Sequence, residues 1–117
     1  MHEFGIAAPL LQAALEISEQ QGGLAVEQIY ARIGRLREIA PDALTFAFNS
    51  LKKGTAAEGA TLVWKEIAPS VRCAQCPAVF QPDDDRIWVC PSCGAGGGEL
   101  LAGNELIVER VILHKGS

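Results

Sequence analysis

The chain has 117 residues, 49% of them hydrophobic, which suffices for one compact domain and a small satellite. Its net charge of −4 and its scattered lysines and arginines argue against nucleic-acid binding, which requires a basic patch to displace counterions from phosphates. No apolar run approaches the ~20 residues of a membrane span, and the N-terminus lacks the features of a secretory signal, so we expect a soluble cytoplasmic protein.

The first two predicted elements are a helix and a strand. Apolar residues on one face at helical spacing predict a helix from about Ile6 to Gln21, ended by Gly22-Gly23. A proline is tolerated only near the start of a helix, so Pro9 predicts that this helix begins irregularly. Alternation and β-branched residues predict a strand over residues 24–36, with Gly34 at a bulge or at the strand's end.

A second helix and two further strands follow. Pro41 is expected at the first position of the helix, which buries Leu44, Phe48 and Leu51 and stops at Lys52-Lys53-Gly54. Strands are predicted over residues 62–67 and 104–113. Because the chain leaves one strand and returns to the other around a separate module, these two strands are expected to lie near one another.

All four cysteines fall into two pairs of identical spacing, Cys73/Cys76 and Cys90/Cys93. A two-residue gap lets consecutive thiolates turn back onto one ion, and Gly94 supplies a permissive backbone after the second pair. The spacing therefore predicts a tetrahedral four-sulfur metal site. Structural zinc is the first choice, and iron of the rubredoxin type is the alternative that the ligands alone do not exclude. Two disulfides or unrelated buried thiols fit the identical spacings less well.

The predicted fold class is α+β, with two helices on a three-stranded mixed sheet and an inserted zinc-ribbon-like module that carries the four cysteines. We assign residues 1–70 and 99–117 to one discontinuous α/β domain. Residues 71–98 form the predicted zinc-binding domain.

Catalysis is not expected. Four thiolates close the coordination shell and leave no position for an activated water. Gly94–Gly98 neither follows a strand nor opens a helix, so it does not resemble a phosphate-binding loop. The two histidines, His2 and His114, form no recognisable arrangement with a serine and an acid. A binding protein is expected, and His114 is expected to be a surface or strand-end residue.

His2 has two interpretations. The simpler is a solvated terminal side chain. The sharper is that the Met1 amine, the backbone nitrogens of His2 and Glu3, and the imidazole chelate one ion in a plane, an arrangement that suits nickel(II) or copper(II). Such a site needs a free amine and a neutral imidazole, so its affinity should fall in acid and should not survive an N-terminal extension.

Several stretches, taken together and in this order, resemble the HypA family of nickel metallochaperones. They are Met1-His2-Glu3, Arg32-Ile33-Gly34-Arg35-Leu36, Pro41-Asp42-Ala43-Leu44-Thr45-Phe46-Ala47-Phe48, Gly54-Thr55, Glu58-Gly59-Ala60, both cysteine pairs, and Gly103-Asn104-Glu105-Leu106. The resemblance covers essentially the whole chain. It implies that His2 is the essential nickel ligand, with the Met1 amine and the Glu3 backbone as supporting donors, and that the four cysteines hold structural zinc.

The resemblance also implies what the protein does. Family members pass Ni(II), their transferable cargo, to the large subunit of [NiFe]-hydrogenase together with a HypB-type GTPase, and some supply urease accessory proteins. Nickel then belongs to the discontinuous domain, and the protein is expected as a monomer or weak homodimer. Two other classes fit the cysteine pairs: a zinc-ribbon adaptor in transcription or translation, and a rubredoxin-like iron electron carrier. Neither explains a histidine at position 2.

Overall fold

The computed structural model describes residues 2–115, which divide into two compact units. The helical unit comprises the residues up to Arg32, Ile39–Lys65 and the residues from Leu106 onward. The cysteine unit comprises Ile33–Glu38 and Glu66–Glu105. It contains all of residues 71–98, where we predict the zinc-binding domain.

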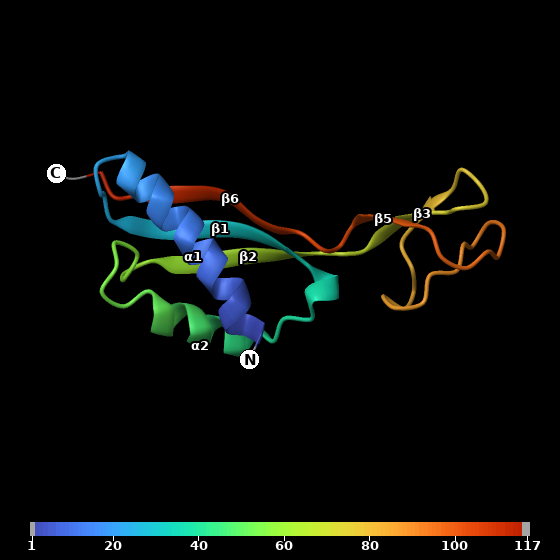
Figure 1. Cartoon of the computed structure of the whole chain (residues 1–117), viewed down its shortest axis with the longest axis horizontal. Helices are drawn as coiled ribbons and strands as arrows, with labels where there is room; N and C mark the ends of the chain where they lie inside the picture. Colours follow the sequence, from blue (N-terminus) through green and yellow to red (C-terminus); the bar gives the residue numbers. More distant parts are fainter. Residues whose placement is uncertain (1, 116–117) are drawn as a thin grey trace. The chain divides into compact units, whose positions relative to one another are not determined.

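The helical unit has two helices, α1 (His2–Gln20) and α2 (Pro41–Leu51), and a three-stranded sheet. The sheet contains β1 (Val26–Gly34), β2 (Thr61–Ile67) and β6 (Leu106–Leu113) in the order β2-β1-β6. β1 and β2 run in the same direction and β6 in the opposite one, so the sheet is mixed, as predicted (Figure 1). β2 and β6 were expected to lie near one another; they belong to the same sheet, with the central strand β1 between them.

Helix α1 begins earlier than predicted, at His2, and it contains Pro9 in its interior. The prediction of an irregular start near Pro9 was therefore wrong. Proline in a helix loses one backbone hydrogen bond and costs ~3 kcal/mol, whereas each fully buried Ile or Leu contributes ~1.5–3 kcal/mol. Ile6, Leu10 and Leu11 are buried on the inner face while Pro9 is exposed, so packing outweighs the local cost.

The inner face of α1 packs against α2 and β6. The predicted stop is confirmed: Gly22 and Gly23 adopt φ values of 86° and 82°, and the Gly23 N–H donates to the Ser18 carbonyl at 2.8 Å. These are the left-handed residues and the closing hydrogen bond that end many helices.

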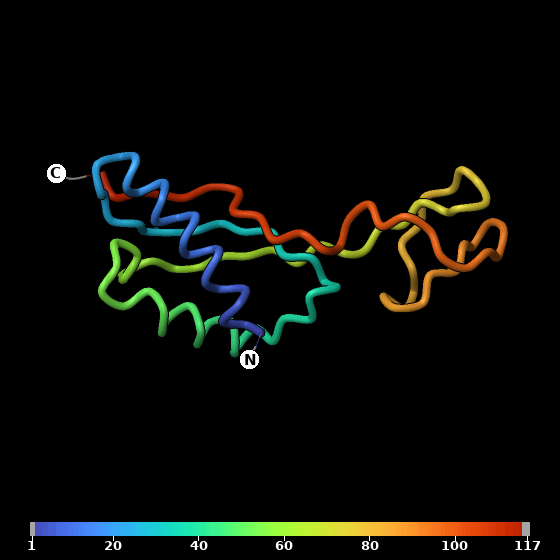
Figure 2. The backbone as a smooth tube through the Cα atoms, in the orientation of Figure 1, coloured from blue at the N-terminus to red at the C-terminus, as the bar shows by residue number. Residues whose placement is uncertain are grey.

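Helix α2 begins at Pro41, as predicted, after an extended Ala40. It buries Leu44, Ala47 and Phe48 completely or nearly so, while Leu51 is half-buried. Figure 2 shows the start of α1 beside the segment that leads into α2. The core of the unit thus lies between the two helices and the sheet, where β1 contributes Val26, Ile29 and Ala31.

The cysteine unit contains a second three-stranded sheet that the sequence did not predict. Its strands are β3 (Ser70–Arg72), β4 (Val79–Phe80) and β5 (Glu99–Ala102), paired antiparallel in the order β4-β3-β5. Strands of two to four residues are too short to show a period in the sequence. Among residues 2–115, no helix has the length and apolar character that crossing a membrane requires.

Candidate metal centre

The four cysteine thiols converge in the cysteine unit. The sulfurs of Cys73, Cys76, Cys90 and Cys93 all lie within 4.8 Å of one another. Cys73 Sγ is 3.6 Å from Cys93 Sγ, and Cys76 Sγ is 3.6 Å from Cys90 Sγ. A disulfide would need sulfurs at about 2.05 Å. All four cysteines are free, and each pair predicted from the sequence meets the other.

Two equivalent backbone turns place the sulfurs. The Cys73 N–H donates to the Ala78 carbonyl at 2.9 Å, and the Cys90 N–H donates to the Ala95 carbonyl at the same distance. In the second turn the Gly94 N–H also donates to the Cys90 carbonyl at 2.8 Å, with Gly94 at φ 78°. The repeated Cys-x-x-Cys spacing therefore folds twice into the same knuckle, and the left-handed Gly94 explains the glycine after the second pair.

The sulfur arrangement fits a tetrahedral ion. With metal–sulfur bonds of about 2.3 Å, the sulfurs of such a site are about 3.8 Å apart, close to the separations found here. Cys73 and Cys90 are buried in a small apolar cluster with Val71 and Phe80, and Trp88 packs against the same cluster. Four thiolates facing one point fill a coordination shell, so the site suits a structural ion.

Backbone hydrogen bonds favour the deprotonated, metal-binding form of the Cys90 thiol. Hydrogen bonds from the backbone of Cys93 and Ser92 lower the pKa of Cys90 to about 6. A backbone hydrogen bond with Ala78 lowers the pKa of Cys76, but burial and the neighbouring thiols outweigh it and raise that pKa to about 12. Metal binding must therefore displace protons, and the affinity of the site falls as the pH is lowered.

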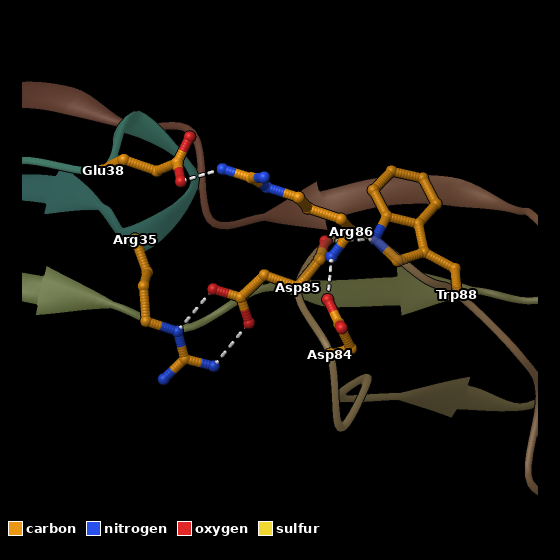
Figure 3. Close-up of polar contacts among 6 residues, drawn as sticks. All are labelled: Arg35, Glu38, Asp84, Asp85, Arg86 and Trp88. Carbon is orange, nitrogen blue, oxygen red and sulfur yellow. Dashed lines mark hydrogen bonds and ion pairs between the residues drawn. The ribbon is translucent and has the colours of Figure 1, made fainter.

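A polar cluster holds the loop between the knuckles (Figure 3). The Arg35 guanidinium makes two hydrogen bonds to the Asp85 carboxylate, at 2.8 and 2.9 Å. Arg86 pairs with Glu38, and the Trp88 indole N–H donates to the Asp85 carbonyl at 2.8 Å. The sequence does not predict this cluster, because Arg35 and Glu38 lie about fifty positions from Asp85 and Arg86 and no periodic pattern links them.

The Asp85 pair predicts a pH-dependent contribution to stability. The Arg35 guanidinium holds the pKa of the Asp85 carboxyl below its usual range. Such a group stabilises the folded state above its unfolded pKa of about 3.9, and the contribution is lost as the pH falls through the lower folded value. We expect Asp85→Asn to reduce stability at pH 7, and we expect this difference to shrink as the pH falls through the lowered folded-state pKa, where the carboxyl becomes protonated in the folded and unfolded states alike.

Urea unfolding of the natural protein and of Asp85→Asn at a series of pH values measures this difference in stability. Acid-induced loss of metal affects both proteins, so it does not account for the difference between them. Asp83→Asn is the matched control, since Asp83 lies in the same loop and forms no ion pair within residues 2–115. A stability difference for Asp85→Asn that does not shrink as the pH is lowered below the unfolded pKa of about 3.9 would contradict the assignment.

The predicted nickel stretch lies at the start of α1. Met1 lies outside the described residues. The His2 side chain is 56% exposed, and its Nε2 lies 3.6 Å from Oε2 of Glu3. That Oε2 also accepts a hydrogen bond from the Ala40 N–H at 3.2 Å, which holds the pKa of the Glu3 carboxyl below its usual range. The first backbone N–H groups of a helix have no hydrogen-bond partner within it. The amide protons of His2 and Glu3 can therefore be lost without breaking the helix.

His114, the other histidine, lies at the opposite end of the chain from the nickel stretch and contacts Glu27. Its Nδ1 lies 2.8 Å from the Glu27 carboxylate, just after the end of β6, and its side chain is 58% exposed. The prediction of a surface histidine at a strand end is confirmed.

Three comparisons bear on identity. The family model described as "Hydrogenase/urease nickel incorporation, metallochaperone, hypA" matches residues 1–113. The hydrogenase maturation factor HypA of Roseiflexus sp. (strain RS-1) is 36% identical over 106 residues, covering 91% of this chain and 86% of that protein. The HypA of Streptomyces avermitilis is 33% identical over 112 residues, covering 95% and 86%.

The fold agrees with a solved structure. The solution structure of the Ni metallochaperone HypA from Helicobacter pylori superposes with a TM-score of 0.71 over 97% of both chains, at 20% sequence identity. At that identity the likeness speaks for the fold alone. The family model and the relatives carry the assignment: the chain belongs to the HypA family of hydrogenase/urease nickel incorporation metallochaperones.

Proposed function

We propose that this protein binds Ni(II) at its N-terminus and delivers it for the maturation of [NiFe]-hydrogenase, with urease as a second client. The ligands are the Met1 amine, the backbone nitrogens of His2 and Glu3, and the His2 imidazole. The observation that carries the proposal is the position of His2 at the first turn of α1, with an exposed side chain, in a chain of the HypA family.

Helix geometry supports this ligand set. Amide nitrogens ligate nickel only after losing their protons, and in a helix interior that loss would break hydrogen bonds. The amides of the first turn have no such bonds to lose. The site is therefore made from nitrogens that the hydrogen-bond ladder of the helix does not use; the Glu3 N–H is hydrogen-bonded to its own carboxylate instead. A partner's ligands can then remove the ion without unfolding the helix.

The second proposed ion is structural zinc, held by Cys73, Cys76, Cys90 and Cys93. The converging sulfurs and the filled shell support it. Zinc would add folding free energy to a unit whose apolar cluster is small, and its closed shell offers no position for a substrate, consistent with a binding protein and not an enzyme. We assign nickel to residues 1–70 with 99–117, and zinc to residues 71–98.

The proposed partners are a HypB-type GTPase, the hydrogenase large subunit and urease accessory proteins. The proposed location is the cytoplasm, where four free thiols stay reduced. The protein acts as a monomer or weak homodimer.

The decisive test is nickel binding by untagged His2→Ala protein and by protein extended before Met1. Because outer-shell groups alone are worth ~10–100-fold in metal affinity, loss of a direct ligand should weaken nickel binding more than about 100-fold. Isothermal titration calorimetry measures the nickel affinity of each protein. Zinc content and circular dichroism should be unchanged, and His114→Ala is the matched control.

Full nickel affinity in both altered proteins would contradict the proposed site. The purified protein also separates the other classes. A red, reducible protein would indicate iron in the four-sulfur site, and a salt-dependent shift with nucleic acid would indicate a zinc-ribbon adaptor.

A further inference from the structure

Glu3 is unusual among the charged residues of the helical unit because it is buried. Its side chain is 11% exposed, whereas the neighbouring His2 side chain is 56% exposed. A carboxylate is rarely buried unless a hydrogen bond or a charge partner compensates for lost water. The compensating groups here are the N–H of Ala40, which donates to Glu3 Oε2 at 3.2 Å, and the backbone N–H of Glu3 itself.

The donor belongs to the residue that precedes α2. Ala40 is the N-cap of this helix, and no side chain caps the helix at that position. The Glu3 carboxylate therefore connects the first turn of α1 to the chain just before α2. A second contact lies next to it, because the Phe4 and Phe46 rings pack edge-to-face with centroids 6.2 Å apart.

From this geometry, and on the basis of the nickel site proposed above, we infer that Glu3 is a positioning residue. Its carboxylate holds the N-terminal stretch against the start of α2, and it is not itself a nickel ligand. The amine, two backbone nitrogens and imidazole already supply four donors for a planar ion. If Oε2 moved to the ion, the Ala40 N–H would lose its acceptor and the carboxylate would leave its buried position.

In this arrangement the backbone and the side chain of Glu3 have different roles. The Glu3 backbone nitrogen contributes to nickel binding, and the Glu3 side chain fixes where that nitrogen lies. The His2 and Glu3 donors are thus held close together before the ion arrives, so less conformational freedom is lost on binding.

The test compares Glu3→Gln, Glu3→Ala and Ala40→Pro in untagged protein. Glutamine retains an oxygen that can accept from Ala40 but is a much poorer nickel ligand than a carboxylate. Proline at position 40 removes the N–H donor and leaves Glu3 intact. It should be accommodated, because Ala40 is exposed and its φ of −83° is close to that of proline.

We expect Glu3→Gln to bind nickel within about threefold of the natural protein, and Glu3→Ala and Ala40→Pro to bind about tenfold more weakly. The double variant Glu3→Ala with Ala40→Pro should be no worse than either single variant, since both remove the same contact. Glu19→Ala, an exposed carboxylate on the same helix, is the control. In nickel-free protein that keeps its four-cysteine ion, hydrogen exchange of the Ala40 amide should accelerate in Glu3→Ala and much less in Glu3→Gln.

Two results would overturn the inference. Equal weakening by Glu3→Gln and Glu3→Ala, with no effect of Ala40→Pro, would identify the carboxylate as a ligand. Unchanged nickel affinity in both Glu3→Ala and Ala40→Pro would show that the contact does not position the site. Failure of the nickel site itself is distinguishable, because His2→Ala would then keep its affinity, while the exchange of the Ala40 amide still reports on the contact.

Discussion

Replacing Cys90 by serine is expected to abolish metal binding at the four-sulfur site and to unfold the cysteine unit. Cys90 is 1% exposed and its sulfur lies 3.6 Å from that of Cys76. Its replacement therefore removes a buried sulfur ligand from the coordination shell. Apparent binding free energies of structural zinc sites are ~10–16 kcal/mol at pH 7, and they add to folding. A cluster built on Val71, Phe80 and the cysteines is too small to replace that amount.

Metal content by elemental analysis and the fluorescence of Trp88 measure this prediction. Trp88 packs against the cluster, and a Trp64→Phe background leaves it as the only indole in the protein. Ser92→Ala is the matched control, since Ser92 lies in the same knuckle with an exposed side chain. The helical unit should keep its helical circular dichroism. Undiminished metal content in Cys90→Ser would exclude a four-cysteine site.

Replacing Gly34 by alanine is expected to destabilise the protein by about 3 kcal/mol or more, at the upper end of the range for overpacked sites. The reason is space and not backbone strain, because Gly34 has φ −67° and ψ 140°, which any residue adopts. A Cβ at this position would overlap the carbonyl group of Gly103 and the amide nitrogen of Asn104. Both obstacles are backbone atoms, which cannot rotate away as a side chain can.

Two hydrogen bonds hold that backbone in place beside the glycine. The Gly34 N–H donates to the Glu105 carbonyl at 2.8 Å, and the Leu36 N–H donates to the Gly103 carbonyl at 2.9 Å. Denaturant unfolding of Gly34→Ala should therefore show a lower midpoint. Gly59→Ala is the control, since a Cβ there meets nothing within 4 Å. If both alanine variants unfolded at the same denaturant concentration, the close approach would be disproved.

Much of the fold could be predicted because its signals are local. Pro41 and the Lys52-Lys53-Gly54 stop defined α2, and the identical cysteine spacings defined both knuckles. The start of α1 could not be predicted, because the cost of Pro9 is local whereas the compensating burial depends on α2 and β6. β3, β4 and β5 were missed since their pairing, and not their composition, makes them strands.

The candidate sites show the same division. Residue type and spacing suffice to nominate His2 and the four cysteines. They do not reveal that Glu3 contacts Ala40 or that Arg35 contacts Asp85, because these contacts join residues separated by 37 and 50 positions respectively. Long-range polar pairs carry no periodic signature, so only the folded chain identifies them.

The cysteine unit is built from two separate segments of the chain, so it cannot be moved into another protein as one continuous segment. Because this unit includes Ile33–Glu38 as well as Glu66–Glu105, it is not a single cassette in the gene. A graft of residues 66–105 alone would leave behind Arg35, the partner of Asp85, and the backbone that pairs with Gly103 and Glu105. Recombination that swaps only the cysteine-bearing stretch therefore transfers the ligands without their support. Working chimaeras, whether made by evolution or in the laboratory, should exchange both segments together.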